Sequence, residues 1–251
     1  MFSWVDRLRQ HAARLIVGGG DLLFPPRCIH CEGQLCDSLG RWLCGPCADR
    51  LAPTVWNGCR RCGGRAPEPI GSWQCPSCRR LTLRFDAAVP LGVYHEGLDA
   101  LILRMKRPSQ QAVSIALGRL LVQRRGEQLR GCRADLIVPI PMFWTRRIRR
   151  GVNNPDVLAD VLGKSLGVPV RKDVLVQCRR TLPQHHLPRS RRFQNVRDAF
   201  RVRGPEAIHG GRVLLVDDVL TTGATCSEAA KVLKQAGATA VMVAVIARAH
   251  G

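Results

Sequence analysis

Eight of the twelve cysteines in this chain of 251 residues form four pairs, and two residues separate the members of each pair. A gap of this length lets both thiolates of a pair face one metal ion. Two successive pairs therefore offer the four sulfur ligands of one tetrahedral zinc site. The candidate ligands are Cys28, Cys31, Cys44, Cys47, Cys59, Cys62, Cys75 and Cys78.

An internal repeat divides these cysteines into two sets. Moving the sequence along by 31 residues places Cys28 on Cys59 and Cys31 on Cys62. Each copy contains a complete ligand set. We therefore expect two zinc ions, each held by two pairs that follow one another in the chain, with interleaved pairing as the alternative. A closed shell of four thiolates leaves no position for water, so both ions are expected to be structural.

The cellular compartment decides between zinc and disulfides. Asp6, Arg7 and Arg9 interrupt the apolar run that an export signal needs. We therefore expect a cytoplasmic, reducing location, where this spacing more often binds zinc than forms disulfides. An iron–sulfur cluster and redox-active pairs are the remaining alternatives. His30 and Cys36 are expected not to be ligands, because four thiolates already complete the first site.

The N-terminal segment is expected to be an amphipathic helix that packs on its own protein, because Leu8, Leu15 and Ile16 recur at helical spacing. The longest stretch without a charged residue, 235–247, has 13 residues. A transmembrane helix needs about 18 or more apolar residues. We therefore expect no transmembrane segment.

A second group of functional side chains follows the strand-like segment RVLLV. Two acids come first, then a small, hydroxyl-rich turn, then a helix-like segment. Backbone N–H groups and hydroxyls of such a turn can surround a phosphate, and the next helix N-terminus adds its dipole. The acids can accept hydrogen bonds from sugar hydroxyls or hold a hydrated Mg2+. The pattern predicts a sugar-phosphate site made of Asp217, Asp218, Thr221, Thr222, Gly223, Ala224 and Thr225.

Two other interpretations fit this segment less well. Acids that merely cap the next helix would not require a pair of them, nor the sequence TTGAT. A response-regulator receiver carries its acidic pair near the start of the domain, whereas Asp217 lies 34 residues from the last residue of this chain.

Strand-like and helix-like segments alternate from Phe85 onward. Expected strands cover residues 87–94, 135–141, 174–178, 212–216 and 238–247, and expected helices cover 98–106, 112–124, 155–166 and 224–236. Continuous runs of Val, Ile and Leu are typical of a parallel sheet that is covered on both faces. We therefore expect residues 1–84 to form an N-terminal helix and double zinc ribbon, and residues 85–251 to form a doubly wound α/β domain.

The segment VLLVDDVLTTGAT resembles the signature of type I phosphoribosyltransferases for 5-phosphoribosyl 1-diphosphate (PRPP). Together with the cysteine pairs, the segments LLFPPRCIHC, IPMFWTRRIRRGVNN and RRTLPQHHLPRSRRFQNVRDAF extend the resemblance to the ComF/GntX family over nearly the whole chain. That family joins a double zinc ribbon to a type I phosphoribosyltransferase-like domain. The resemblance implies binding of PRPP with Mg2+ and a link to natural competence, the uptake and use of external DNA.

The resemblance also implies roles for individual residues. Asp217 and Asp218, the candidate catalytic pair, would face the ribose hydroxyls, and the threonine loop would hold the 5′-phosphate. A first cluster, Arg146, Arg147, Arg149 and Arg150, lies where the pyrophosphate-binding loop belongs, and Arg146, Arg147 and Arg150 are its candidate PRPP ligands. A second cluster lies in the region that closes over PRPP: Arg179, Arg180, Arg189, Arg191, Arg192 and Arg197. Solvated basic loops are the alternative for both clusters.

The chain departs from the family pattern where Val152 replaces the usual Phe and Asn154 the usual Gln. These departures concern the acceptor pocket more than the phosphate loop. No residue is required as a general base, and His185 and His186 are the candidates if one exists.

Lysine and arginine total 39 against 19 acidic residues, a net charge of +20, which favours an anionic partner. One hypothesis is a phosphoribosyltransferase in which PRPP loses pyrophosphate as its C1′ becomes oxocarbenium-like. The other is a zinc-ribbon protein that binds single-stranded DNA or proteins of the competence machinery and retains a vestigial PRPP site. The two hypotheses are compatible.

Overall fold

The computed structural model describes residues 25–35, 42–64, 75–79, 81–94, 97–184 and 187–249. The expected N-terminal helix, Cys36, His185 and His186 lie outside these residues. The chain forms two compact units, Met1–Arg50 and Leu51–Gly251. The boundary expected between residues 84 and 85 stays a prediction. It was drawn where the cysteine repeat gives way to the α/β pattern, whereas the two units are defined by compactness.

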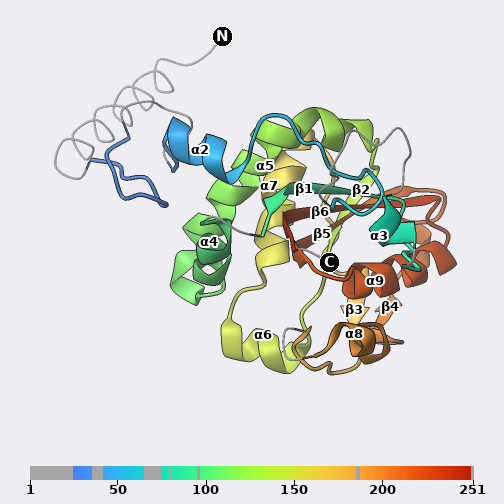
Figure 1. Ribbon diagram of the computed structural model, residues 1–251. Coiled ribbons are helices and arrows are strands. Elements are labelled where there is room, and N and C mark those ends of the chain that lie inside the picture. Colours follow the sequence, from blue (N-terminus) through green and yellow to red (C-terminus); the bar gives the residue numbers. More distant parts are fainter. Residues whose placement is uncertain are drawn as a thin grey trace, which may run out of the picture. The chain divides into compact units, whose positions relative to one another are not determined.

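A four-stranded parallel sheet is the centre of the second unit (Figure 1). Its order is β1 (Ala87–Val93), β6 (Ala240–Arg248), β5 (Arg212–Leu220) and β2 (Leu136–Pro139). The register pairs Val216 of β5 with Pro139 on one side and with Ala244 on the other. Because β5 lies inside the sheet, the residues at its carboxyl end lie among the ends of its neighbours, where open α/β sheets bind ligands.

Helices cover both faces of this sheet, as the continuous apolar strands require. On one face lie α4 (Leu98–Met105), α5 (Gln111–Gly131) and α7 (Asn154–Leu166), and on the other lies α9 (Ala224–Gln235). Val213 and Leu215 of β5 belong to the core beneath α9. Leu214 and Val216 alternate with them and are also fully buried, so the opposite face is covered as well. The expected doubly wound α/β architecture is confirmed.

A smaller antiparallel sheet pairs β3 (Leu175–Gln177) with β4 (Phe200–Val202). The strand expected at 174–178 is therefore present but does not belong to the parallel sheet. Only Leu175 of its three residues is fully buried, so it lacks the two covered faces of a central strand. With α8 (Arg189–Val196), these strands form a substructure that we call the hood: residues 175–184 and 187–202.

The remaining elements are short. They are α2 (Gly45–Leu51), α3 (Pro76–Arg79), α6 (Trp144–Arg150) and two 3-10 turns at Pro108–Gln110 and Pro205–Ala207. Within the part of the chain that the structure describes, no helix combines the length and apolar character needed to cross a membrane.

Candidate functional site

Two clusters of four cysteines can each hold a metal ion. The clusters follow the sequential pairing, Cys28/Cys31 with Cys44/Cys47 and Cys59/Cys62 with Cys75/Cys78, and the sulfurs of each lie within 4.8 Å of one another. The Sγ atoms of Cys31 and Cys44 are 3.7 Å apart, and those of Cys62 and Cys75 are 3.6 Å apart. A tetrahedral zinc with Zn–S bonds of about 2.3 Å requires an edge of about 3.8 Å. The donor sets therefore fit zinc.

The two clusters differ in their surroundings. In the first, Cys31 is exposed and Cys44 is half-buried, and His30 lies beside the cluster with its Nδ1 3.4 Å from Cys47 Sγ. Burial raises the pKa of Cys28, but backbone N–H groups of Cys31, Cys44 and His30 outweigh it and lower that pKa to about 6, which favours the thiolate. In the second cluster all four cysteines are buried.

The second cluster belongs to the core of the α/β unit. Its cysteines pack in one apolar cluster with Leu83, Phe85 and the buried face of α9. The amide of Ala88, in β1, donates to the carbonyl of Arg60 between two cluster cysteines at 3.1 Å. The four cysteines therefore occupy core positions on this side of the sheet that apolar side chains would otherwise fill.

The phosphate-loop candidate, residues 221–225, joins β5 to α9. Gly223 has φ +83°, the left-handed conformation that turns the chain into the helix. A Cβ at this position would lie 3.0 Å from Leu83 Cδ2. The Thr222 hydroxyl accepts a hydrogen bond from the amide of Ala224 at 3.4 Å. The loop is thus held closely against residues 81–86, which precede β1 and which we call the linker.

The two acids lie in the last part of β5, which extends to Leu220 and is longer than the strand expected from the sequence. Asp217 Oδ1 accepts the amide of Asp218 at 2.8 Å, and Asp218 Oδ1 accepts the amide of Val219 at the same distance. Each carboxylate is therefore held by the backbone of the next residue and is half-buried.

Burial raises the pKa of Asp217 well above its ordinary value, and the neighbouring charge of Asp218 raises it further. The thiol of Cys226 lies 3.7 Å from Asp217 Oδ2. Burial and the two acids raise the pKa of that thiol as well, so Cys226 stays protonated and can donate toward Asp217. A carboxylate with a raised pKa at a strand end is typical of a functional site.

A cleft of about 380 Å³ opens at the carboxyl ends of β2 and β5. Six of the ten residues expected to bind PRPP line it: Asp217, Asp218, Thr221, Thr225, Arg146 and Arg150. Thr222, Gly223 and Ala224 are buried behind this surface. Arg147 forms an ion pair with Asp156 at 3.1 Å, which turns its guanidinium to α7.

The cleft also contains residues that sequence reasoning missed. Tyr94, Lys106 and Asn153 line it beside the acids and arginines. Asn153 donates to the carbonyl of Ile140 at 3.0 Å and so fixes the segment that follows β2. Lys106 lies in the segment MKRPSQQ, where the adjacent basic residues Lys106 and Arg107 could have indicated a contact with an anionic ligand.

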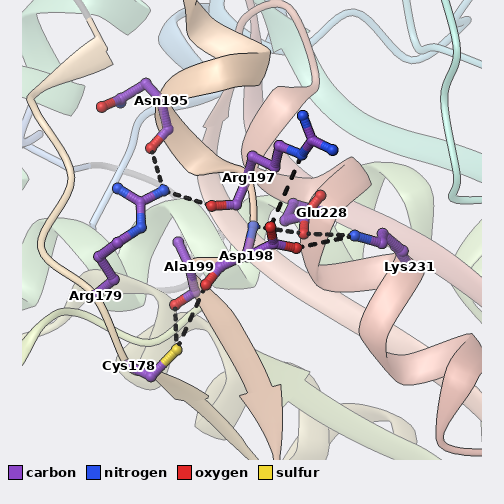
Figure 2. A network of polar contacts seen from close by, with 8 residues as sticks. All are labelled: Cys178, Arg179, Asn195, Arg197, Asp198, Ala199, Glu228 and Lys231. Carbon is purple, nitrogen blue, oxygen red and sulfur yellow. Dashed lines mark hydrogen bonds and ion pairs between the residues drawn. The ribbon is translucent and has the colours of Figure 1, made fainter.

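The hood directly contacts residues 221–225, the candidate phosphate loop. Gln184 donates from its Nε2 to the Thr225 hydroxyl at 2.7 Å. Behind this contact, the amide of Asp198 donates to Glu228 of α9 at 2.9 Å, and Lys231 bridges Asp198 and Glu228 at 3.3 and 3.2 Å (Figure 2). Arg179 donates to the carbonyls of Asn195 and Arg197 at the end of α8. The hood is therefore attached to the helix that follows the loop.

Comparison with known proteins agrees with this geometry. A family model described as a phosphoribosyl transferase domain matches residues 149–251. The chain is 32% identical to Competence protein F of Haemophilus influenzae, over 89% of this chain and 97% of that protein. It is 31% identical to the DNA utilization protein YhgH of Escherichia coli K12, over 88% of this chain and 96% of that protein.

Two solved structures of enzymes are more distant. One is the glutamine phosphoribosylpyrophosphate amidotransferase of B. subtilis with ADP and GMP, at 21% identity and a TM-score of 0.38. The other is described as the allosteric regulatory enzyme of purine biosynthesis, at 22% identity and a TM-score of 0.40. Each match covers 59% of this chain and 30% of the other.

The two relatives match this chain over nearly their full lengths, and the chain contains both a phosphoribosyltransferase-type domain and paired cysteine clusters. Identity above 30% covers almost the whole of both relatives. The phosphoribosyltransferase-type domain and the paired cysteine clusters are present as the resemblance implied. The chain belongs to the ComF/GntX family.

Proposed function

We propose that this chain binds PRPP together with Mg2+ in the cleft at the end of β5 and transfers its phosphoribosyl group. The observation that carries the proposal is the convergence of two acids, two loop threonines and two arginines on one cleft of about 380 Å³. These are the groups that a ribose, a 5′-phosphate and a pyrophosphate require.

Each end of the ligand has its own residues in this proposal. The hydroxyls of Thr221 and Thr225 and the N-terminus of α9 hold the 5′-phosphate. Asp217 and Asp218 accept hydrogen bonds from the ribose hydroxyls. Arg146 and Arg150 face the pyrophosphate, and their guanidinium groups can bind its oxygens bidentately.

In the reaction, the bond between C1′ and the pyrophosphate oxygen breaks with both electrons leaving on oxygen, and the acceptor nucleophile forms the new bond to C1′. When bound with PRPP, Mg2+ would neutralise part of the charge on the leaving group. The arginines stabilise the same charge, and the hood excludes water from the oxocarbenium-like C1′. The proton that the acceptor loses passes to the departing pyrophosphate, and no residue of the chain is assigned as a base.

Calorimetric titration with PRPP and Mg2+ tests the site. Asp217→Asn/Asp218→Asn is expected to abolish measurable binding, because both acceptors of the ribose hydroxyls are lost. Asp160→Asn, which removes an exposed acid paired with Lys172, is the matched control and is expected to bind normally. Each protein is titrated at two salt concentrations. Normal binding by the double variant would show that the site is wrong.

We also propose that both cysteine clusters bind structural zinc. The Sγ–Sγ distances of 3.6 to 3.7 Å, close to the edge of a zinc–sulfur tetrahedron, support this. Elemental analysis of the purified protein is expected to give about two zinc ions per chain. Iron with a visible charge-transfer band would contradict the assignment.

A second function, binding of single-stranded DNA during its uptake, is supported by one surface. On α6, Trp144 is 63% exposed and Ile148 is 76% exposed, next to four arginines of the same helix. Exposed aromatic rings among arginines can stack on bases while the arginines contact phosphates. The names of the relatives, a competence protein and a DNA utilization protein, point to the same process. Proteins of the competence machinery are the corresponding protein partners.

Fluorescence anisotropy with a labelled oligothymidine tests this second function. The logarithm of the affinity is expected to fall with the logarithm of salt at a slope of about −0.7 per neutralised phosphate. Trp144→Ala is expected to weaken binding by about 1–3 kcal/mol through lost stacking. Val55→Ala removes an exposed apolar side chain elsewhere and is the control. Equal affinity of the Trp144 variant and the wild type would remove α6 from the interface.

A further inference from the structure

A buried arginine connects the second cysteine cluster to the phosphate loop. Arg248, near the end of β6, is only 6% exposed. Its Nε donates to the carbonyl of Cys62 at 2.8 Å, and its Nη1 donates to the carbonyl of Leu220 at 2.9 Å and also to that of Thr221. One guanidinium therefore holds a ligand residue of the cluster and the first residue of the loop.

A second set of contacts joins the same two parts. Arg61, between two cluster cysteines, donates to the carbonyl of Leu83 at 2.7 Å, and its guanidinium lies 5.7 Å from the ring centre of Phe85. Leu83 and Phe85 pack against Gly223 of the loop. The Ser227 hydroxyl, in the first turn of α9, accepts the amide of Arg84 at 2.9 Å. The linker thus lies between the cluster and the loop.

The position of the Cys62 carbonyl depends on the metal, because coordination by the sulfurs of Cys59 and Cys62 fixes the backbone between these two residues. Four thiolates and one divalent ion also leave a net charge of about −2, which attracts a guanidinium. The guanidinium is planar and its donors are fixed relative to one another. A shift of one carbonyl is therefore passed to the other through a rigid group.

We propose that Arg248 is a positioning residue that makes the phosphate loop depend on the metal of the second cluster. The inference rests on the proposed function for its ligand, PRPP. It assigns the two copies of the repeat different roles: the metal at Cys59/Cys62/Cys75/Cys78 is required for a loop that binds phosphate, and the metal of the first cluster is not.

The repeat supplies a matched pair of variants. Cys62→Ser and Cys31→Ser alter corresponding positions, and each is expected to lower the zinc count by about one ion per chain. Only Cys62→Ser is expected to increase amide hydrogen exchange in residues 220–226 and to weaken PRPP binding, by about tenfold or more, at least the size of effect found when a group that supports a metal ligand is removed. Equal effects of the two substitutions on the loop would overturn the proposal.

Arg248→Met tests the connection without touching a ligand. It is expected to keep both zinc ions, to increase exchange in residues 220–226 and to weaken PRPP binding by a similar factor. Arg171→Met removes an exposed arginine of the same unit and is the control. If Cys62→Ser does not fold, this variant decides. Unchanged loop exchange in Arg248→Met would overturn the proposal.

The two readouts separate this inference from the proposed function. If the wild-type protein with two zinc ions does not bind PRPP, the proposed function fails. Loop exchange does not need a ligand, so it still tests the connection between cluster and loop. Faster exchange in both Cys62→Ser and Arg248→Met, with Cys31→Ser unchanged, would support the connection in that case as well.

Discussion

Asp217 is held in a position that raises its pKa through burial and through the charge of Asp218. A carboxyl whose pKa is higher in the folded than in the unfolded state contributes stability at low pH, and this contribution is lost as pH rises through the folded pKa. Neutral pH lies above the ordinary carboxyl pKa of about 4, so Asp217 lowers the free energy of unfolding there. Such a cost is common where a site is arranged for a ligand.

Asp217→Asn is accordingly expected to stabilise the ligand-free protein at neutral pH, by about 0.5–2 kcal/mol, the usual size of such changes. The gain is expected to shrink as pH falls through the folded pKa of Asp217. Urea unfolding over a pH series measures it. Asp173→Asn is the control of opposite sign, because the hydrogen bond from Arg171 lowers the pKa of Asp173. A loss of stability in Asp217→Asn at neutral pH would contradict the account.

The loop between β5 and α9 depends on Gly223 for two reasons, its φ of +83° and its contact with Leu83. Gly223→Ala is expected to cost about 1–2 kcal/mol for the backbone conformation and an additional amount for the contact. Gly210→Ala has a similar φ of +73° but open space around it, so it isolates the first cost. Thermal unfolding of both variants compares them. Equal losses would show that the contact with the linker is unimportant.

The attachment of the hood to α9 can be weakened at one side chain. Glu228, 13% exposed, accepts the amide of Asp198 and pairs with Lys231. Glu228→Ala is expected to cost about 1–2 kcal/mol and to increase amide exchange in the hood. Lys231→Ala removes the two ion pairs and keeps the amide contact, and it is expected to cost about 0–1 kcal/mol. A larger loss in the Lys231 variant would show that the ion pairs, not the amide contact, hold the hood.

The sequence predicted the elements that have strong local patterns. The parallel strands are continuous apolar runs, and the acids and threonine loop form one unbroken segment, so both were found. Of the hood, the strand at 174–178 was expected, but β4 and its pairing with that strand were not, because β4 has three residues and lies across a gap of more than twenty residues. Arg248 and Gln184 reach the loop from distant segments, and no spacing rule connects them with it.

A second buried arginine holds the segment before the second cluster to the sheet. Arg125 of α5 is 1% exposed and donates to the carbonyls of Pro53, Thr54, Pro90 and Leu91. Burial, with a smaller effect of Arg124, lowers its pKa to about 10. It therefore remains charged at neutral pH, and the carbonyl dipoles that accept its hydrogen bonds stabilise that charge.

Arg125→Met is expected to lower the free energy of unfolding of the Leu51–Gly251 unit by about 3 kcal/mol or more, because several buried carbonyls lose their donor at once. Chemical denaturation followed by circular dichroism measures this loss. Arg119→Met, on an exposed position of the same helix, is the control and is expected to change stability by less than about 0.5 kcal/mol. Similar losses in the two variants would contradict the role given to Arg125.

The strand order has a consequence for biosynthesis. β6, the last strand along the described chain, pairs with β1 on one side and β5 on the other. Until the ribosome has made residues 240–248, β1 and β5 lack the strand that joins them. Their apolar side chains then remain partly exposed to solvent. The cysteine clusters need only nearby residues, so they can take up metal first. The nascent chain can thus bind its metals before its parallel sheet is complete. The cleft forms only when the sheet does.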